Sequence, residues 1–182
     1  KNKGYKISYA TSIGPTIFEK TEKKINEEIK ILLNKFDYIS VRDTNTAKLV
    51  KEMTGKQPQI VVDPIFLTDL NFLDYSNKKI ENFILIYGLV FSKEDKIKII
   101  NFSKSKNLKI ISIGHYNDWV DENYIHANPE EFLSYISQAK YVFTSMFHGV
   151  MFSVKFKRNF WYSDDRIRTN KMGYFLNNLN LL

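Results

Sequence analysis

The sequence predicts an α/β protein with two Rossmann-like domains, each built on a parallel sheet. Apolar strand-like segments alternate with amphipathic helix-like segments along the whole chain. Strands that are apolar throughout and separated by single helices indicate parallel sheets covered on both faces. A polar stretch at residues 71–82 interrupts the alternation, and we interpret it as a linker between domains at 1–70 and 83–182.

The first domain, residues 1–70, has only about three predicted strands. Its second helix is expected to begin at a cap on Asp43 or Thr44 and to end at Gly55. An open parallel sheet that starts in mid-pattern is physically unusual, so we expect this sheet to be incomplete because an N-terminal part of the protein is absent from the chain. The predicted strands are 6–9, 38–41 and 59–62, and the predicted helices are 21–36 and 44–53.

The second domain, residues 83–182, repeats the alternation with clearer helix signals. Ser92 and Asp95 have the spacing of a capping box. Asn128 followed by Pro129 is typical of a helix start, since proline fits the first turn. The predicted strands are 83–89, 109–113, 141–144 and 159–162, and the predicted helices begin at residues 93, 129, 147 and 166.

Composition excludes several classes of function. The chain of 182 residues contains no cysteine, which excludes disulfides, thiolate metal sites and a cysteine nucleophile. The net charge is +7, but the lysines are scattered rather than clustered on one face, so we expect no nucleic-acid partner. No apolar stretch reaches the roughly 20 residues of a membrane span. We therefore expect a cytoplasmic protein, with peripheral contact to an anionic membrane as an alternative.

The segment Thr144–Gly149 is the strongest candidate site. It lies where a predicted strand meets a predicted helix, at the carboxyl end of a parallel strand, where open α/β sheets bind ligands. The first-turn amides of that helix favour a phosphate or carboxylate, Ser145 could add a hydroxyl, and His148 could act as an acid. Gly149 would allow close approach of backbone or ligand. The alternative is a helix-capping turn with a packed histidine.

Three further positions are candidates for lining a ligand-binding cleft together with this segment. His115 follows the strand at 109–113, and Ser12 and Gly14 lie in a loop of small residues after the first strand. For His115 the alternative is an exposed loop histidine. The three histidines have no metal-ligand spacing, so we expect no metal site.

Arginine is rare in this lysine-rich chain, which makes each arginine informative. Its planar fork binds phosphate or carboxylate through paired bonds that lysine cannot form. Arg42 follows the strand at 38–41 and could point into a cleft; the alternatives are an ion pair with Asp43 or a helix cap. Arg166 and Arg168 follow the strand at 159–162, after two aspartates that are expected to cap the last helix.

In this order and spacing, several segments together resemble the polysaccharide pyruvyl transferase family. The match covers nearly the whole chain, and its strongest piece runs from Val142 to Ser153. The family's N-terminal glycine-rich segment has no counterpart here, which agrees with the incomplete first sheet and implies that this chain alone is inactive. The matching segments are Ile7–Gly14, Ile39–Asp43, Val62–Thr68, Val142–Ser153 and Arg166–Ile167.

The resemblance implies a GT-B-like fold of two domains and a transferase activity. The implied donor is phosphoenolpyruvate. The implied acceptor is a saccharide of the bacterial surface, free or lipid-linked, which receives the pyruvyl group as a ketal. His148 would be the catalytic acid, and the scheme needs no cofactor. The proposed donor-binding residues are Arg42, Ser145, Gly149, Arg166 and Arg168. The alternatives are a nucleotide-sugar glycosyltransferase of the same architecture and a non-catalytic anion-binding remnant.

Overall fold

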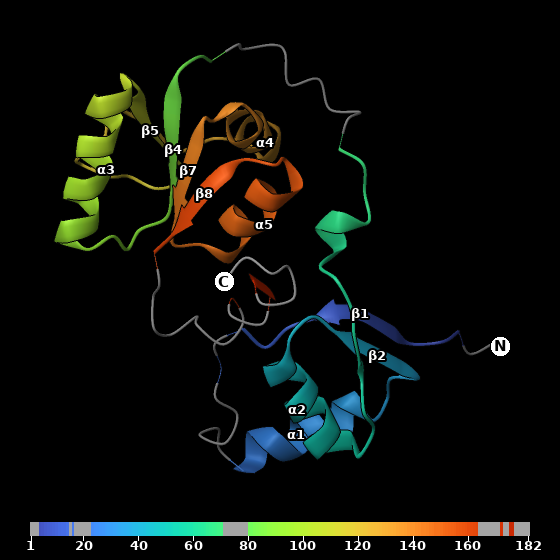
Figure 1. Ribbon diagram of the computed structural model, residues 1–182. Coiled ribbons are helices and arrows are strands. Elements are labelled where there is room, and N and C mark those ends of the chain that lie inside the picture. The colour runs from blue at the N-terminus through green and yellow to red at the C-terminus, as the bar shows by residue number, and fades with distance from the viewer. Residues whose placement is uncertain are drawn as a thin grey trace. The chain divides into compact units, whose positions relative to one another are not determined.

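The computed structural model describes residues 4–14, 16, 23–70, 80–163, 172, 175 and 176. The chain divides into two compact units, one formed by residues 1–67 with 166–182 and the other by residues 68–165, and each is treated by itself. Both units are built on parallel sheets, which confirms the predicted α/β class. Most of the predicted linker lies outside the described residues. Figure 1 labels the elements used below.

The first unit contains a three-stranded parallel sheet in the order β1-β2-β3. Ile39 and Val41 of the central strand face the helices and pack with residues such as Leu49, while Tyr38 on the other face is exposed. The period of two along the strand decides which side chains enter the core. The elements are β1 (Ile7–Thr11), α1 (Lys23–Leu33), β2 (Tyr38–Val41), α2 (Thr44–Thr54) and β3 (Gln59–Ile60).

Both ends of α2 follow from local sequence. Asp43 Oδ1 accepts hydrogen bonds from Thr46 N and Thr46 Oγ1, each at 2.8 Å, and caps the first turn. Gly55 closes the helix at φ +74°, where its N–H donates to Lys51 O at 2.8 Å. The predicted stop at Gly55 and the cap at Asp43 are confirmed.

The strand β1 carries a bulge that redirects the chain at its carboxyl end. Its register with β2 shifts between Ser8 and Thr11, and Ala10 adopts φ +52°, a left-handed conformation that is unfavourable for a residue with a Cβ. Ser40 holds the distortion, because its Oγ accepts from Ala10 N at 3.3 Å and donates to Ser8 O at 3.1 Å. The bulge sets the direction of the loop that contains Ser12.

The second unit contains a five-stranded parallel sheet in the order β6-β5-β4-β7-β8. Counted from the first strand of the unit, this order is 3-2-1-4-5, that of a doubly wound fold. The predicted strand order is confirmed. The elements are β4 (Phe83–Tyr87), α3 (Lys93–Lys106), β5 (Lys109–Ile113), β6 (Glu122–Tyr124), α4 (Pro129–Gln138), β7 (Tyr141–Thr144), α5 (Phe147–Lys155) and β8 (Asn159–Tyr162).

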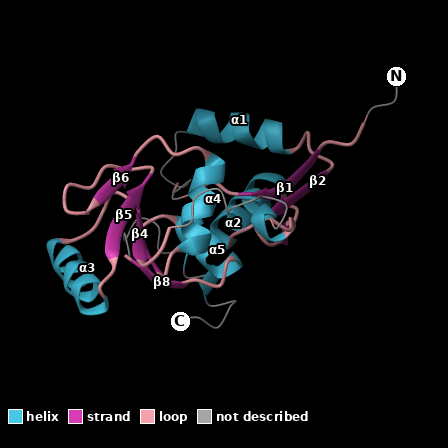
Figure 2. Ribbon diagram, turned by 90° about the horizontal axis from the view of Figure 1, so that it is seen from above, coloured by secondary structure: helices cyan, strands magenta, loops and turns pink. Residues whose placement is uncertain are grey.

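Helices cover both faces of this sheet, and the central strand contributes to both cores. Phe83 and Leu85 pack in the core beneath α4 and α5, whereas Ile84 and Ile86 pack in the core beneath α3. Figures 1 and 2 both show α3 on one face and α4 and α5 on the other. The uninterrupted apolar sequence of β4 is therefore explained by burial on two sides.

Two short elements of the structure were not expected from the sequence. The strand β6 and a short 3-10 helix, η2 (Pro64–Phe66), were not predicted. β6 is a three-residue segment of half-buried, largely polar residues, so it carries no apolar signal. The two predicted helix caps are confirmed as capping boxes, Ser92 with Asp95 and Asn128 with Glu131.

Candidate active site

The two strands at which the order of the five-stranded sheet reverses are tied together at their carboxyl ends. Tyr87 ends β4 and pairs with Thr144, which ends β7. Thr144 Oγ1 donates to Tyr87 O at 2.6 Å, and Ser145 N donates to the same oxygen at 3.3 Å. From this point β4 leads to α3 on one face and β7 leads to α5 on the other. Open α/β sheets bind their ligands at such a reversal.

Thr144 also shapes the turn that starts α5. Met146 N donates to Thr144 Oγ1 at 3.0 Å, and the helix begins at Phe147. Gly149 N donates back to Met146 O at 3.0 Å. The N–H groups in the first turn of a helix point out of its N-terminus and, together with the helix dipole, favour an anion. The start of α5 therefore has the local geometry suited to a phosphate or carboxylate.

Ser145 and Gly149 are buried, and each is in close contact with a neighbouring strand end. Ser145 is 2% exposed, and a Cβ built on Gly88 would lie only 2.2 Å from its Oγ. A Cβ built on Gly149 would lie 2.2 Å from Thr144 Oγ1. The requirement for glycine at position 149 is thus explained by packing inside the protein. The roles of both residues in donor binding remain predictions.

His148 is exposed on the first turn of α5. Its ring meets the ring of Phe147 edge-on, with centroids 5.6 Å apart and planes at 82°. An exposed imidazole beside a helix N-terminus can reach a ligand bound there. This placement agrees with a role for His148 in chemistry or in binding, and the two require separate tests.

His115 lies at the same edge of the sheet, after β5. Its ring stacks on Tyr87 at 5.9 Å with planes at 24°, and its backbone oxygen accepts from Ser112 Oγ at 2.7 Å. Burial raises the pKa of Tyr87 above its ordinary value, so its phenol stays neutral at physiological pH. His115 is therefore packed on an aromatic ring and is not the freely exposed loop histidine that was the alternative.

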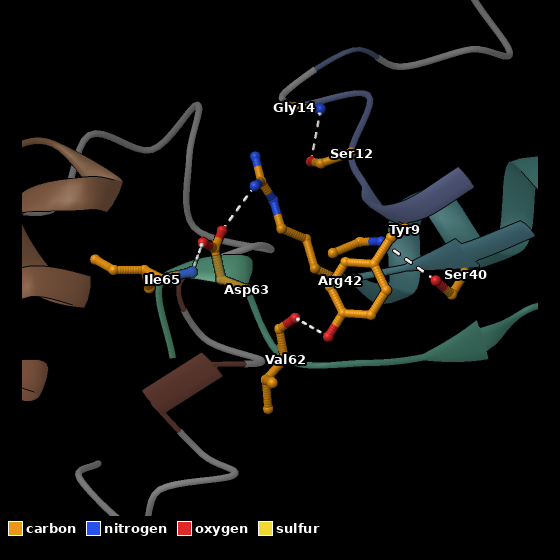
Figure 3. A network of polar contacts seen from close by, with 9 residues as sticks. Tyr9, Ser12, Gly14, Ser40, Arg42, Val62, Asp63 and Ile65 are labelled. Atoms are coloured by element: carbon orange, nitrogen blue, oxygen red, sulfur yellow. Dashed lines mark hydrogen bonds and ion pairs between the residues drawn. The ribbon is translucent and has the colours of Figure 1, made fainter. Parts of the chain in front are cut away.

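The carboxyl edge of the first sheet is organised by Arg42 and Asp63 (Figure 3). Arg42 Nη1 lies 2.7 Å from Asp63 Oδ2, and Asp63 Oδ1 accepts from Ile65 N at 3.2 Å. Arg42 therefore forms its ion pair with Asp63, and not with Asp43, which caps α2. Arg42 N donates to Thr11 O at 3.2 Å, which places it beside the end of β1.

Ser12 and Gly14 form a turn next to Arg42 that is attached to the start of α2. Gly14 N donates to Ser12 Oγ at 3.1 Å, and Gly14 adopts φ +65°, which favours glycine. Ile13 N donates to Thr46 Oγ1 at 3.1 Å. The ends of β1 and β2 thus share one network, as Figure 3 shows in part.

A family model for polysaccharide pyruvyl transferases matches residues 1–163. This range includes every described strand of both sheets, the turn before α5 and the Arg42–Asp63 pair. The chain belongs to the polysaccharide pyruvyl transferase family. The resemblance stated from the sequence is confirmed.

Membership of the polysaccharide pyruvyl transferase family makes a transferase with a polysaccharide acceptor the general assignment. A comparison with curated proteins found no match to this chain. Among the helices of the described residues, none combines the length and the apolar character needed to cross a membrane.

Two predicted donor-binding residues of this family member, Arg166 and Arg168, lie outside the described residues. The two aspartates before them, at 164 and 165, and most of the predicted last helix lie outside them as well. These residues also follow the end of the family match at residue 163. Their roles therefore remain predictions from the sequence.

Three residues were given no site role from the sequence. Asp63 falls within the matching segment Val62–Thr68, and its position after β3 parallels that of Arg42 after β2. Gly88 follows β4 and Asn117 lies in a polar loop, and no local pattern connects either one to Ser145.

Proposed function

We propose that the protein transfers the pyruvyl group of phosphoenolpyruvate onto two hydroxyls of a bacterial surface saccharide and forms a ketal. The family match over residues 1–163 is the observation that carries this proposal. The proposal includes a GT-B-like fold of two α/β units. The acceptor would be a polysaccharide or its lipid-linked precursor.

The donor carries a phosphate and a carboxylate, so it needs two groups that bind anions. The first turn of α5 offers backbone N–H groups and the positive end of a helix dipole. Arg42 offers a guanidinium whose orientation is held by Asp63. We propose each of these groups as a candidate for donor binding, with Ser145 and Gly149 shaping the turn and Arg166 and Arg168 as further donor-binding candidates.

The chemical step requires an acid. Protonation of the methylene carbon of phosphoenolpyruvate makes the adjacent carbon electrophilic, and one sugar hydroxyl adds to it. Phosphate then leaves, and the second hydroxyl closes the ketal. One proton enters the new methyl group, the two hydroxyl protons are released, and the products are the pyruvate ketal and inorganic phosphate.

His148 is our candidate for this acid. It is exposed on the first turn of α5, beside the proposed phosphate position. A neighbouring anion stabilises the protonated imidazole, which keeps a proton available near neutral pH. A positioned general acid typically contributes about 10²- to 10⁴-fold to the rate.

The decisive experiment measures phosphate release by the full-length enzyme with phosphoenolpyruvate and a panel of saccharide acceptors. Acceptor-dependent release, together with a product heavier by one pyruvate ketal, is the expected result. Parallel reactions with nucleotide sugars test a glycosyltransferase of the same architecture. Turnover of a nucleotide sugar without use of phosphoenolpyruvate would overturn the proposal, and binding without turnover of either donor would indicate a non-catalytic remnant.

A further inference from the structure

Asn117 is a buried residue that connects the loops after β4 and β5. It is 5% exposed, and its Nδ2 donates to Gly88 O at 3.1 Å and to Ser112 Oγ at 2.9 Å. Its Oδ1 accepts from Trp119 Nε1 at 3.2 Å. Both ends of the amide therefore have partners, and a satisfied buried network holds its members in one arrangement.

The backbone of Asn117 is also anchored, through Asn123 of β6. Asn117 N donates to Asn123 Oδ1 at 2.9 Å, and Asn123 Nδ2 donates to Asn117 O at 3.0 Å. Asn123 in turn pairs with Ser112 in the parallel ladder between β5 and β6. The side-chain amide that binds Gly88 O is consequently held in place by β5 and β6, although Asn117 lies in a loop.

Gly88 is the residue through which Asn117 affects the turn before α5. Gly88 adopts φ +154°, and a Cβ built on it would lie 2.2 Å from Ser145 Oγ and 3.0 Å from Ser145 N. The two residues are therefore packed as closely as a glycine allows. Any displacement of Gly88 toward β7 must move Ser145, and Ser145 is followed directly by the turn that starts the helix carrying His148.

We propose that Asn117 is a positioning residue for the donor site. By holding Gly88 O, it sets the position of Gly88 against Ser145, and through Ser145 the position of the first turn of α5. The inference rests on the proposed function, because it assigns the donor phosphate to that turn. Asn117 acts through Gly88 and Ser145 rather than through contact with the donor.

The test compares Asn117→Ala and Asn117→Asp with a matched control in the full-length enzyme. The aspartate keeps the acceptor for Trp119 Nε1 but loses the donor to Gly88 O. We expect either change to raise the KM for phosphoenolpyruvate about tenfold or more, since a displacement of about 1 Å can lower rates by about 10². The control is Ser103→Ala, which removes a buried hydrogen bond of 2.6 Å to Leu108 O at the amino end of β5.

The comparison separates positioning from simple stabilisation. All three variants should unfold more easily, but only the Asn117 variants should lose affinity for phosphoenolpyruvate. Equal KM values for the Asn117 variants and Ser103→Ala would overturn the inference. If Asn117→Ala does not fold, Gly88→Ala provides a second route to the same displacement and should raise the KM as well; an unchanged KM in that variant would also overturn the inference.

Inorganic phosphate gives a readout that does not depend on turnover. Its titration, followed by the amide NMR signals of Phe147 and His148, should show weaker binding in Asn117→Asp than in Ser103→Ala. Equal binding in the two variants would overturn the positioning role. A wild-type enzyme that binds phosphate at this turn but never uses phosphoenolpyruvate would overturn the proposed function alone.

Discussion

Arg42 Nη1 and Asp63 Oδ2 lie 2.7 Å apart and join the carboxyl ends of β2 and β3. The side chain of Arg42 is 21% exposed and that of Asp63 only 6%. Because a charge-assisted hydrogen bond to a buried carboxylate is short and directional, it holds the guanidinium in one orientation. Arg42 is thus pre-organised at the edge of the first sheet.

Arg42→Lys should weaken donor use while leaving the fold intact. Lysine keeps the positive charge but cannot form paired bonds to an anion while also holding Asp63. We expect the KM for phosphoenolpyruvate to rise about tenfold, the equivalent of one lost interaction of about 1.4 kcal/mol. Steady-state kinetics with a far-UV circular dichroism control provide the measurement. Unchanged kinetics would remove Arg42 from the donor site.

A companion variant, Asp63→Asn, shows whether the ion pair orients Arg42. The amide oxygen can still accept from Ile65 N, so the start of η2 is kept. The substitution removes only the negative charge of Asp63 that faces Arg42. The KM for phosphoenolpyruvate should rise less than in Arg42→Lys. A larger rise than in Arg42→Lys would mean that Asp63 itself contacts a substrate.

His148→Gln distinguishes the acid from an anchor. Glutamine can form hydrogen bonds but cannot donate a proton as an acid. If His148 supplies the proton, kcat should fall about 10²-fold or more with the KM for phosphoenolpyruvate little changed. A variant with normal kcat and a raised KM would assign His148 to donor binding. A variant that keeps both constants would leave the proposed mechanism without its acid.

Gly149→Ala should destabilise the second unit, because the new methyl would lie 2.2 Å from Thr144 Oγ1 and 2.8 Å from Thr144 Cβ. Overpacking of this kind typically lowers the free energy of unfolding by about 1–3 kcal/mol. Urea unfolding is the measurement. Gly4→Ala is the matched control, since a Cβ at Gly4 meets no atom within 4 Å. Equal midpoints for the two variants would contradict the packing argument.

Stability should decline in alkaline solution partly because of Tyr135. Burial raises the pKa of Tyr135 well above its ordinary value, and the neighbouring Tyr124 adds to the effect. Above about pH 10 the unfolded chain therefore releases this proton first, and the free energy of unfolding falls as pH rises. Tyr135→Phe has no proton to lose, so its decline between about pH 9.5 and 11.5 should be shallower.

The control for this titration is Tyr5→Phe, because Tyr5 is 76% exposed. Urea unfolding at a series of pH values gives the slopes. A Tyr5→Phe slope as shallow as that of Tyr135→Phe would show that burial of Tyr135 does not govern the decline.

The helices and most strands could be predicted from sequence because their causes are local. Ser92 with Asp95 and Asn128 with Glu131 define helix starts within four residues, and the apolar run of β4 announces burial on two faces. The strand β6 could not be predicted, since a short polar segment becomes a strand only when β5 lies beside it. The family could also be recognised from ordered segments of the sequence.

The candidate site was only partly accessible to the same reasoning. Position at strand ends identified Arg42 and His148, because the carboxyl ends of parallel strands meet at one edge of a sheet. The partner of Arg42 is 21 residues away, and Thr144 reaches Tyr87 across 57 residues. Asn117 and Gly88, separated by 29 residues, meet only through the parallel pairing of β4 and β5.

The sequence alone therefore determined the α/β class, the starts of the capped helices, the family and the strand ends at which chemistry is expected. The tertiary structure decided which side chains meet there: Asp63 beside Arg42, Gly88 against Ser145, and Asn117 holding Gly88. The physical reason is the distance along the sequence over which each kind of interaction acts. Capping and periodicity act within a few residues, whereas ion pairs and close packing depend on which strands become neighbours in the folded sheet.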